Sequence, residues 1–153
     1  MNDNAQKRAI IIGASYAGLV AAAGLKCHGW TVRVLEKSIE RSRSGGGVVV
    51  QRRMLEYLER HGVAFPGVAS IPARTRRIFR QDGQVMEMPE TAAAYTSWDV
   101  LLKELEGVVG SEHIERGLAM SDIPDWGDPG IVELNDGTTD QADIVVAADG
   151  IGS

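Results

Sequence analysis

An α/β fold built around a parallel sheet is predicted by three features of this 153-residue chain. A β-branched run at residues 8–12 is followed at once by a glycine-containing turn and an Ala- and Leu-rich segment. Two further apolar runs, at residues 30–36 and 143–148, have the composition of strands that are buried on both faces. Such strands belong to sheets covered by helices, so we expect a doubly wound, Rossmann-like arrangement.

The first 36 residues predict a β-α-β unit suited to a dinucleotide. Gly13 permits a tight turn out of the strand, and Gly18 lets the helix expected at residues 19–28 pack closely on the sheet. The start of that helix directs unpaired N–H groups and a positive dipole end toward a pyrophosphate. Glu36 ends the second strand, where its carboxylate can accept hydrogen bonds from ribose hydroxyls. It would also repel a 2′-phosphate, which favours FAD or NAD over NADP.

Ser15 occupies the middle glycine position of the dinucleotide pattern G-x-G-x-x-G. A serine with negative φ still allows close backbone approach, and its hydroxyl can add a phosphate contact. The alternative is a relaxed nucleophile elbow, G-x-S-x-A, in which Ser15 would be the nucleophile of an α/β hydrolase. The available bases would be His28, His61 and His113, and His28 lies at the far end of the same predicted helix. The dinucleotide interpretation is therefore favoured.

The middle of the chain predicts a loop, a hairpin and two helices. Residues 41–51 join arginines and glycines to a short apolar run, which indicates either backbone approach to a ligand or a solvated loop. A helix is expected after this segment. Asp82-Gly83 lies between two extended runs and predicts a hairpin over residues 74–88. Thr96 and Asp99 resemble a capping box that opens a second helix, which ends near residue 110.

The last third of the chain is predicted to be rich in strands. Residues 114–123, 130–134 and 138 onward are strand-like, and Asn135-Asp136-Gly137 predicts a hairpin turn. These strands are expected to form a β-meander before the final buried strand, which ends at Asp149-Gly150.

Composition excludes several classes of protein. The net charge of −5 argues against a nucleic-acid binder held by phosphate contacts, and the arginines of residues 74–80 are better explained as a solvated sheet face. The single cysteine excludes an intrachain disulfide and a multi-thiolate zinc site, and no spacing indicates another metal site. The first residues lack the apolar stretch and cleavage site expected of a signal peptide, and no apolar run approaches the roughly 18 residues that span a membrane. We therefore expect a cytoplasmic protein that binds neither nucleic acid nor membrane.

The ordered motifs resemble a known family. GASYAG, the acidic Glu36, RSRSGGGVVVQ before a helix, TSWD before another helix and ADIVVAADGIGS follow one another in the chain. This order resembles the single-component, FAD-dependent aromatic hydroxylases, and within them the 2,6-dihydroxypyridine 3-monooxygenase branch. That branch carries a serine at the third position of the glycine motif, as Ser15 does here. Trp98 departs from the family, because many relatives have an FAD-contacting arginine at this helix start.

The resemblance implies which residues contact the cofactor. It places the glycine turn on the FAD pyrophosphate, Glu36 on the adenosine ribose, Arg43 on phosphate and Asp149 near the pyrophosphate–ribityl region. The full implied set is Gly13, Ala14, Ser15, Tyr16, Ala17, Gly18, Glu36, Lys37, Arg43, Gln51 and Asp149. No catalytic residue and no metal ligand is implied.

The resemblance also implies an activity and an organisation. In this family NAD(P)H, a transient co-substrate, reduces the FAD, and the reduced flavin uses O2 to hydroxylate a small aromatic or heteroaromatic substrate. Members are much longer than this chain, so residues 1–153 are expected to be an incomplete FAD-binding domain, with residues 70–95 a partial substrate-domain insertion. Its oligomeric state stays open, a homodimer included. The leading alternative is a non-catalytic dinucleotide-binding module.

Overall fold

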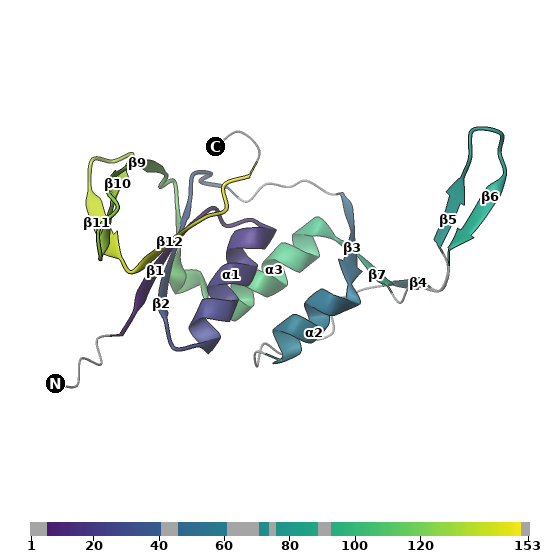
Figure 1. Cartoon of the computed structure of the whole chain (residues 1–153), viewed down its shortest axis with the longest axis horizontal. Helices are drawn as coiled ribbons and strands as arrows, with labels where there is room; N and C mark the ends of the chain where they lie inside the picture. Colours follow the sequence, from purple (N-terminus) through teal and green to yellow (C-terminus); the bar gives the residue numbers. More distant parts are fainter. Residues whose placement is uncertain (1–5, 41–45, 61–70, 74–75, 89–92, 151–153) are drawn as a thin grey trace. The chain divides into compact units, whose positions relative to one another are not determined.

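The computed structural model describes residues 6–40, 46–60, 71–73, 76–88 and 93–150 (Figure 1). The chain divides into two compact units, which are considered separately. The first unit consists of Met1–Arg43 and Leu102–Ser153, and the second unit consists of Ser44–Leu101.

A four-stranded parallel sheet forms the centre of the first unit, as the buried apolar runs predict. Its strands, in spatial order, are β12 (Ile144–Ala147), β1 (Arg8–Ile12), β2 (Thr31–Glu36) and β8 (Ile114–Arg116). Helix α1 (Tyr16–Cys27) connects β1 to β2 and begins earlier than the predicted residue 19. This β1-α1-β2 crossover is the β-α-β unit that the sequence predicts.

Alternate residues of the sheet pack against different layers. On one face lies an antiparallel meander, β9 (Met120–Asp125), β10 (Gly130–Leu134) and β11 (Thr139–Ala142), and α1 lies on the other (Figure 1). The core between sheet and meander consists of Ile10, Ile12, Leu35, Val132, Leu134 and Ala142. The parallel strands are thus covered on both sides.

The chain between residues 114 and 123 was predicted as one strand, and this prediction is wrong. Strand β8 pairs in parallel with β2, whereas β9 belongs to the meander. Between them Gly117 has φ +80°, a conformation that L side chains rarely adopt and that lets the chain leave one sheet and enter the other. The predicted turn at residues 135–137 is confirmed, because the Gly137 N–H donates to the Leu134 carbonyl at 3.0 Å.

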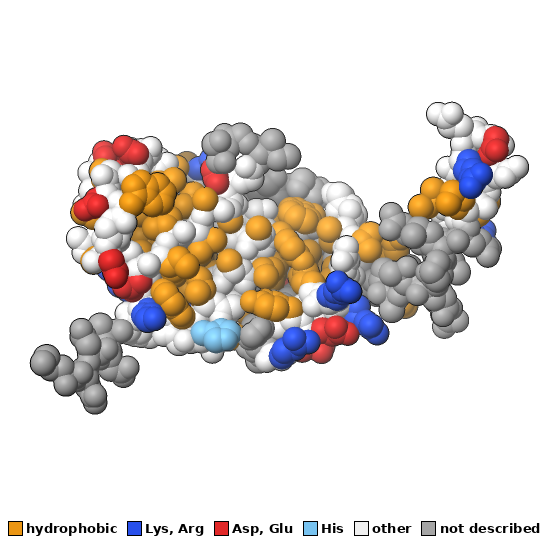
Figure 2. All heavy atoms as spheres, in the orientation of Figure 1, with side chains coloured by type: hydrophobic (Ala, Val, Ile, Leu, Met, Phe, Trp, Pro, Cys, Tyr) orange, Lys and Arg blue, Asp and Glu red, His pale blue; other side chains and the backbone are white. Residues whose placement is uncertain are grey.

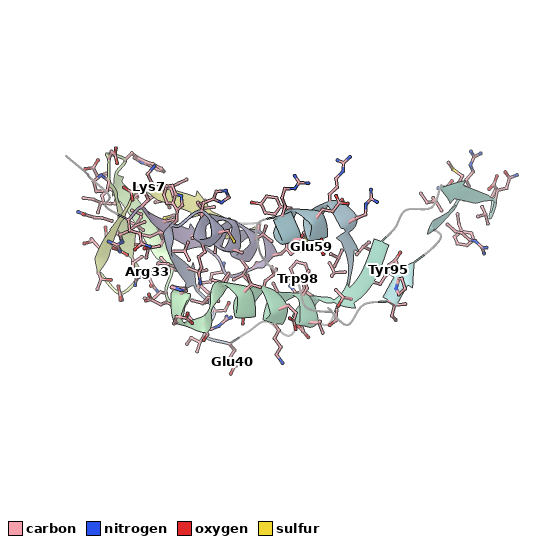
Figure 3. The ribbon with its side chains drawn as sticks, turned by 90° about the horizontal axis from the view of Figure 1, so that it is seen from below. Lys7, Arg33, Glu40, Glu59, Tyr95 and Trp98 are labelled. Carbon is pink, nitrogen blue, oxygen red and sulfur yellow. The ribbon has the colours of Figure 1, made fainter. Side chains whose placement is uncertain are left out.

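Arg33 connects the meander to the sheet of the first unit (Figure 3). Its guanidinium donates to both carboxylate oxygens of Glu115 on β8, each at 2.7 Å, and to Asp140 on β11 at 2.8 Å. Arg8 on β1 donates to the other oxygen of Asp140 at 2.9 Å. Four charged side chains from four strands therefore form one continuous network.

The second unit contains a three-stranded antiparallel sheet, a helix and a hairpin. Its elements are β3 (Gly47–Gln51), α2 (Arg52–Arg60), β4 (Ile71–Ala73), β5 (Arg76–Phe79), β6 (Val85–Met88) and β7 (Ala93–Ser97), and the sheet order is β3-β7-β4. Strands β5 and β6 form the predicted hairpin, closed by the Arg80 N–H, which donates to the Gln84 carbonyl at 2.9 Å.

Helix α3 (Trp98–Val109) begins one residue later than its predicted cap implies. Thr96 is still part of strand β7, and it is the hydroxyl of Ser97 that accepts the Val100 N–H at 3.3 Å. Ser97 is therefore the N-cap, because this bond reaches the third residue of the helix. No helix in the described part of the chain is long and apolar enough to cross a membrane.

Candidate functional site

The carboxyl ends of the four parallel strands form one edge of the sheet in the first unit. Along this edge lie, in strand order, Asp149 after β12, Gly13 after β1, Glu36 at the end of β2 and Arg116 at the end of β8. Neighbouring strands are separated by about 4.8 Å, so these positions form an extended row. In open α/β sheets, ligands bind outside this edge.

Gly13 is enclosed on two sides by neighbouring strands. Its N–H donates to the Leu35 carbonyl at 2.7 Å, and its φ is +103°. A Cβ built on Gly13 would lie 2.6 Å from the Ala148 carbonyl oxygen and 3.1 Å from the Asp149 Cα. The turn therefore accommodates only glycine here, both for its backbone conformation and for its contact with the segment after β12.

The start of α1 is suited to an anion. Ser15 has φ −90° and ψ −176°, which confirms that a serine fits the middle position of the glycine pattern with an ordinary extended backbone. Its side chain is exposed and makes no capping hydrogen bond, and the first turn of α1 carries no acidic residue. The hydroxyl and the positive end of the helix thus lie beside the same turn.

Close packing of α1 on the sheet depends on Gly18. A Cβ on this residue would overlap the Gly13 carbonyl oxygen and would lie 3.2 Å from Cγ2 of Ile11. Tyr16, the first residue of α1, is half-buried, and this burial raises the pKa of its phenol. Ala14 is buried and Ala17 is exposed.

The carboxylate of Glu36 accepts two backbone hydrogen bonds. Oε2 accepts from the Ala14 N–H and Oε1 from the Ser38 N–H, both at 2.9 Å. Burial would raise the pKa of Glu36, but these bonds and the nearby charge of Arg116 lower it overall. The group is therefore ionised at neutral pH, and each oxygen retains capacity to accept another donor. Lys37, the next residue, is exposed.

Arg116 is a residue of this edge that sequence reasoning did not identify. It stands directly opposite Glu36 across the β2–β8 pairing, and its guanidinium donates to Oε1 of Glu106 on α3 at 2.7 Å. The pairing joins residues that are far apart in the chain, so local patterns do not reveal it. The one available signal is Gly117, which ends β8 immediately after Arg116.

The predicted site residues do not all come together. Asp149 is half-buried and lies beside Gly13, so the glycine turn, Glu36, Lys37 and Asp149 occupy the same edge. Gln51 is exposed at the end of β3, in the second unit. Arg43 lies outside the described residues.

A Ser–His hydrolase centre is not supported. Ser15 and His28 flank the 12-residue helix α1, which spans about 18 Å, and Nδ1 of His28 is 2.8 Å from the Gly24 carbonyl oxygen. His113 lies next to Glu112, with its Nε2 3.6 Å from Oε1, and His61 is outside the described residues. Within the described ranges no group of His, Cys, Asp or Glu side chains could hold a metal ion.

Known proteins share both sequence and fold with this chain. It is 34% identical over 156 residues to 2-heptyl-3-hydroxy-4(1H)-quinolone synthase of Mycobacteroides abscessus, covering 94% of this chain and 40% of the relative. It is 26% identical over 144 residues to 2,6-dihydroxypyridine 3-monooxygenase of Paenarthrobacter nicotinovorans, covering 94% and 36%. The solved tetrameric form of 2-methyl-3-hydroxypyridine-5-carboxylic acid oxygenase is similar with a TM-score of 0.82 and 27% identity, covering 97% and 41%.

The chain spans about two fifths of the length of these relatives. Residues 6–119 match the FAD binding domain family, a range that contains the glycine turn, Glu36 and Arg116. The match and the relatives confirm the resemblance drawn from the motifs. The chain belongs to the FAD binding domain family and corresponds to the FAD-binding portion of flavin-dependent aromatic monooxygenases.

Proposed function

We propose that the carboxyl edge of the parallel sheet holds the ADP part of FAD. The observation that carries this proposal is the row of Asp149, Gly13 and Glu36 on three adjacent strands. Gly13, Ser15 and Gly18 would contact the pyrophosphate, Glu36 the adenosine ribose, and Asp149 the region between pyrophosphate and ribityl chain. The remaining proposed contacts are Ala14, Tyr16, Ala17, Lys37, Gln51 and Arg43.

The electrostatics of the edge support FAD. The positive end of α1 and the absence of acidic residues from its first turn favour the pyrophosphate. Glu36, ionised and half-buried, would accept hydrogen bonds from the ribose hydroxyls and would disfavour a 2′-phosphate at the same place. These residues bind and orient the cofactor, whereas the redox chemistry with O2 is supplied by the bound flavin.

For the longer protein represented by the relatives, we propose NAD(P)H-dependent hydroxylation of a small aromatic or heteroaromatic ring. This proposal is supported by the names of the similar proteins, which include a dihydroxypyridine monooxygenase and a hydroxypyridine-carboxylic acid oxygenase. NAD(P)H would bind transiently, and the segment of residues 70–95 would belong to the part that contacts the substrate. The alternative, a non-catalytic dinucleotide module, predicts no NAD(P)H oxidation in response to an aromatic compound.

A pair of Ser15 variants tests cofactor binding. Ser15→Asp and Ser15→Asn have nearly the same size, and both residues are favourable N-caps, so α1 is expected to form in each. A carboxylate about 4 Å from a phosphate costs roughly 1–4 kcal/mol at the dielectric of a protein surface. We therefore expect FAD affinity, measured by quenching of flavin fluorescence, to fall at least about fivefold further in Ser15→Asp than in Ser15→Asn. Equal affinities of the two variants would contradict the proposed site.

A further inference from the structure

Strand β2 holds the glycine turn through two successive hydrogen bonds. The Gly13 N–H donates to the Leu35 carbonyl at 2.7 Å, and the Ala14 N–H donates to Oε2 of Glu36 at 2.9 Å. The first bond continues the backbone pairing of β1 with β2. The second bond extends this contact by one residue with a side chain, at the point where the main chain turns away into α1.

The Ala14 N–H depends on this carboxylate. Ala14 is only 6% exposed, and a buried N–H group requires a hydrogen-bond partner. The residue precedes the N-cap of α1, so its N–H is not part of the helix. Without Glu36 the group would have to turn toward water, and the backbone between Gly13 and Ser15 would have to turn with it.

The backbone and a nearby positive charge favour the ionised form of this carboxylate. Arg116 stands opposite Glu36 on β8 and is itself held by Glu106 of α3 at 2.7 Å. Oε1 of Glu36 accepts the Ser38 N–H, so both carboxylate oxygens are oriented by the backbone. Burial would raise the pKa of Glu36, but the two backbone bonds and Arg116 lower it overall.

We propose that Glu36 is a positioning residue for the glycine turn, which its bond to the Ala14 N–H holds in the binding conformation before any ligand arrives. The identity of the ligand that binds this turn rests on the proposed function, whereas the hydrogen bond between Glu36 and the Ala14 N–H does not. A carboxylate that only recognised ribose would leave the unliganded turn unchanged when replaced. Replacing a carboxylate that organises the turn would change the conformation of the unliganded turn.

The first test needs no variant and no ligand. In an NMR titration of the unliganded chain, the amide resonances of Ala14 and Ser38 should shift together with the side-chain carboxyl carbon of Glu36, with one shared apparent pKa below the ordinary Glu value. Protonation weakens the acceptor for both N–H groups, which is why both should report it. An Ala14 amide that does not follow the Glu36 carboxyl would overturn the proposal.

The second test compares two variants with the same change of charge. Glu36→Ala removes both acceptor oxygens, whereas Glu40→Ala removes an exposed carboxylate outside the site. Hydrogen exchange at the Ala14 amide should accelerate about tenfold or more in Glu36→Ala and remain unchanged in Glu40→Ala. Equal protection of Ala14 in all three proteins would refute the positioning role.

The binding of inorganic pyrophosphate distinguishes a failure of this proposal from a failure of the proposed function. Removing a negative charge alone would strengthen pyrophosphate binding, whereas loss of an organised turn should weaken it in Glu36→Ala relative to Glu40→Ala. Equal or tighter binding in Glu36→Ala would count against the positioning role. If pyrophosphate and FAD fail to bind the parent chain, the proposed function fails, and the titration and exchange results still decide the role of Glu36.

Discussion

The two units of the chain differ in how far their apolar side chains are buried. In the first unit the large apolar residues of strands β1 and β2 are buried, with Ile10, Ile11, Val34 and Leu35 at 1% exposure or less. In the second unit many of them are exposed, among them Ile71 at 75% and Phe79 at 67%. Figure 2 shows apolar side chains at the surface of the β5–β6 hairpin. The unit that carries the proposed cofactor site therefore has its own core, and the second unit does not have one of comparable extent in the described residues.

The architecture of each unit explains this difference. A parallel sheet covered by α1 on one face and by the meander on the other buries both sets of alternating side chains. The β5–β6 hairpin has only two strands, and the cross-strand pairs Phe79–Val85 and Ile78–Met86 lie on opposite faces. Two strands cannot cover both faces, and such a hairpin is marginally stable by itself.

A row of exposed apolar residues extends the same pattern to the β3-β7-β4 sheet. Val49, Tyr95 and Ile71 are direct neighbours across the three strands and are all exposed (Tyr95 is labelled in Figure 3). Contiguous apolar surface of this kind is typical of faces that contact other protein. The second unit is thus built like a part of a larger layer.

The largest expected difference between the units is the cost of truncating an apolar side chain. Leu134→Ala removes a side chain that is 1% exposed in the core between sheet and meander, and should lower the free energy of unfolding by about 2–5 kcal/mol. Ile71→Ala removes an exposed side chain of similar size in the second unit and should cost about 0.5 kcal/mol or less. Urea unfolding followed by circular dichroism measures both. Similar losses would show that the second unit has a core after all.

Features that depend on neighbouring residues could be predicted from the sequence, whereas features that depend on long-range strand pairing could not. The β1-α1-β2 unit, the serine in the glycine pattern and the position of Glu36 follow from residues within one supersecondary unit, and the structure has them as predicted. The division of residues 114–123 between two sheets and the approach of Arg116 to Glu36 depend on strand pairing across most of the chain. Periodicity within a short window cannot report such pairing.

The next largest difference between the two units is expected in the cost of removing an ion pair. Arg33 bridges three strands of the first unit and is 27% exposed, whereas Arg52 forms an exposed pair with Glu56 on α2, with Nε and Oε1 3.1 Å apart. Arg33→Met should lower the free energy of unfolding by about 1–2 kcal/mol, since Asp140 loses a partner while Glu115 is partly solvated. Arg52→Met should cost about 0.5 kcal/mol or less.

The cost of Arg33→Met should depend on pH. Hydrogen bonds from Arg33 lower the pKa of Glu115 more than burial raises it. Burial would raise the pKa of Asp140, but the Gln141 N–H and the two arginines lower it overall. Because the folded pKa values lie below the unfolded ones, the stabilisation is complete above about pH 4.5 and is lost as the pH falls through the folded values. The difference between parent and variant, measured by urea unfolding, should therefore shrink below about pH 4. A constant difference down to pH 3 would show that the network does not titrate with these carboxylates.

The smallest effect is expected at the start of α3, where the sequence indicated Thr96 as the cap and the structure has Ser97. The Ser97 hydroxyl accepts the Val100 N–H at 3.3 Å, a long bond for this pair of atoms. Ser97→Ala should therefore cost about 1 kcal/mol or somewhat less, and Ser97→Asn, which keeps a side-chain acceptor, should restore most of it. Thermal unfolding gives the free-energy change, and hydrogen exchange at the Val100 amide locates it. Faster exchange at Val100 in Ser97→Ala but not in Ser97→Asn is the expected pattern. If Ser97→Ala leaves both measurements unchanged, the cap lies elsewhere and the sequence-based assignment to Thr96 regains support.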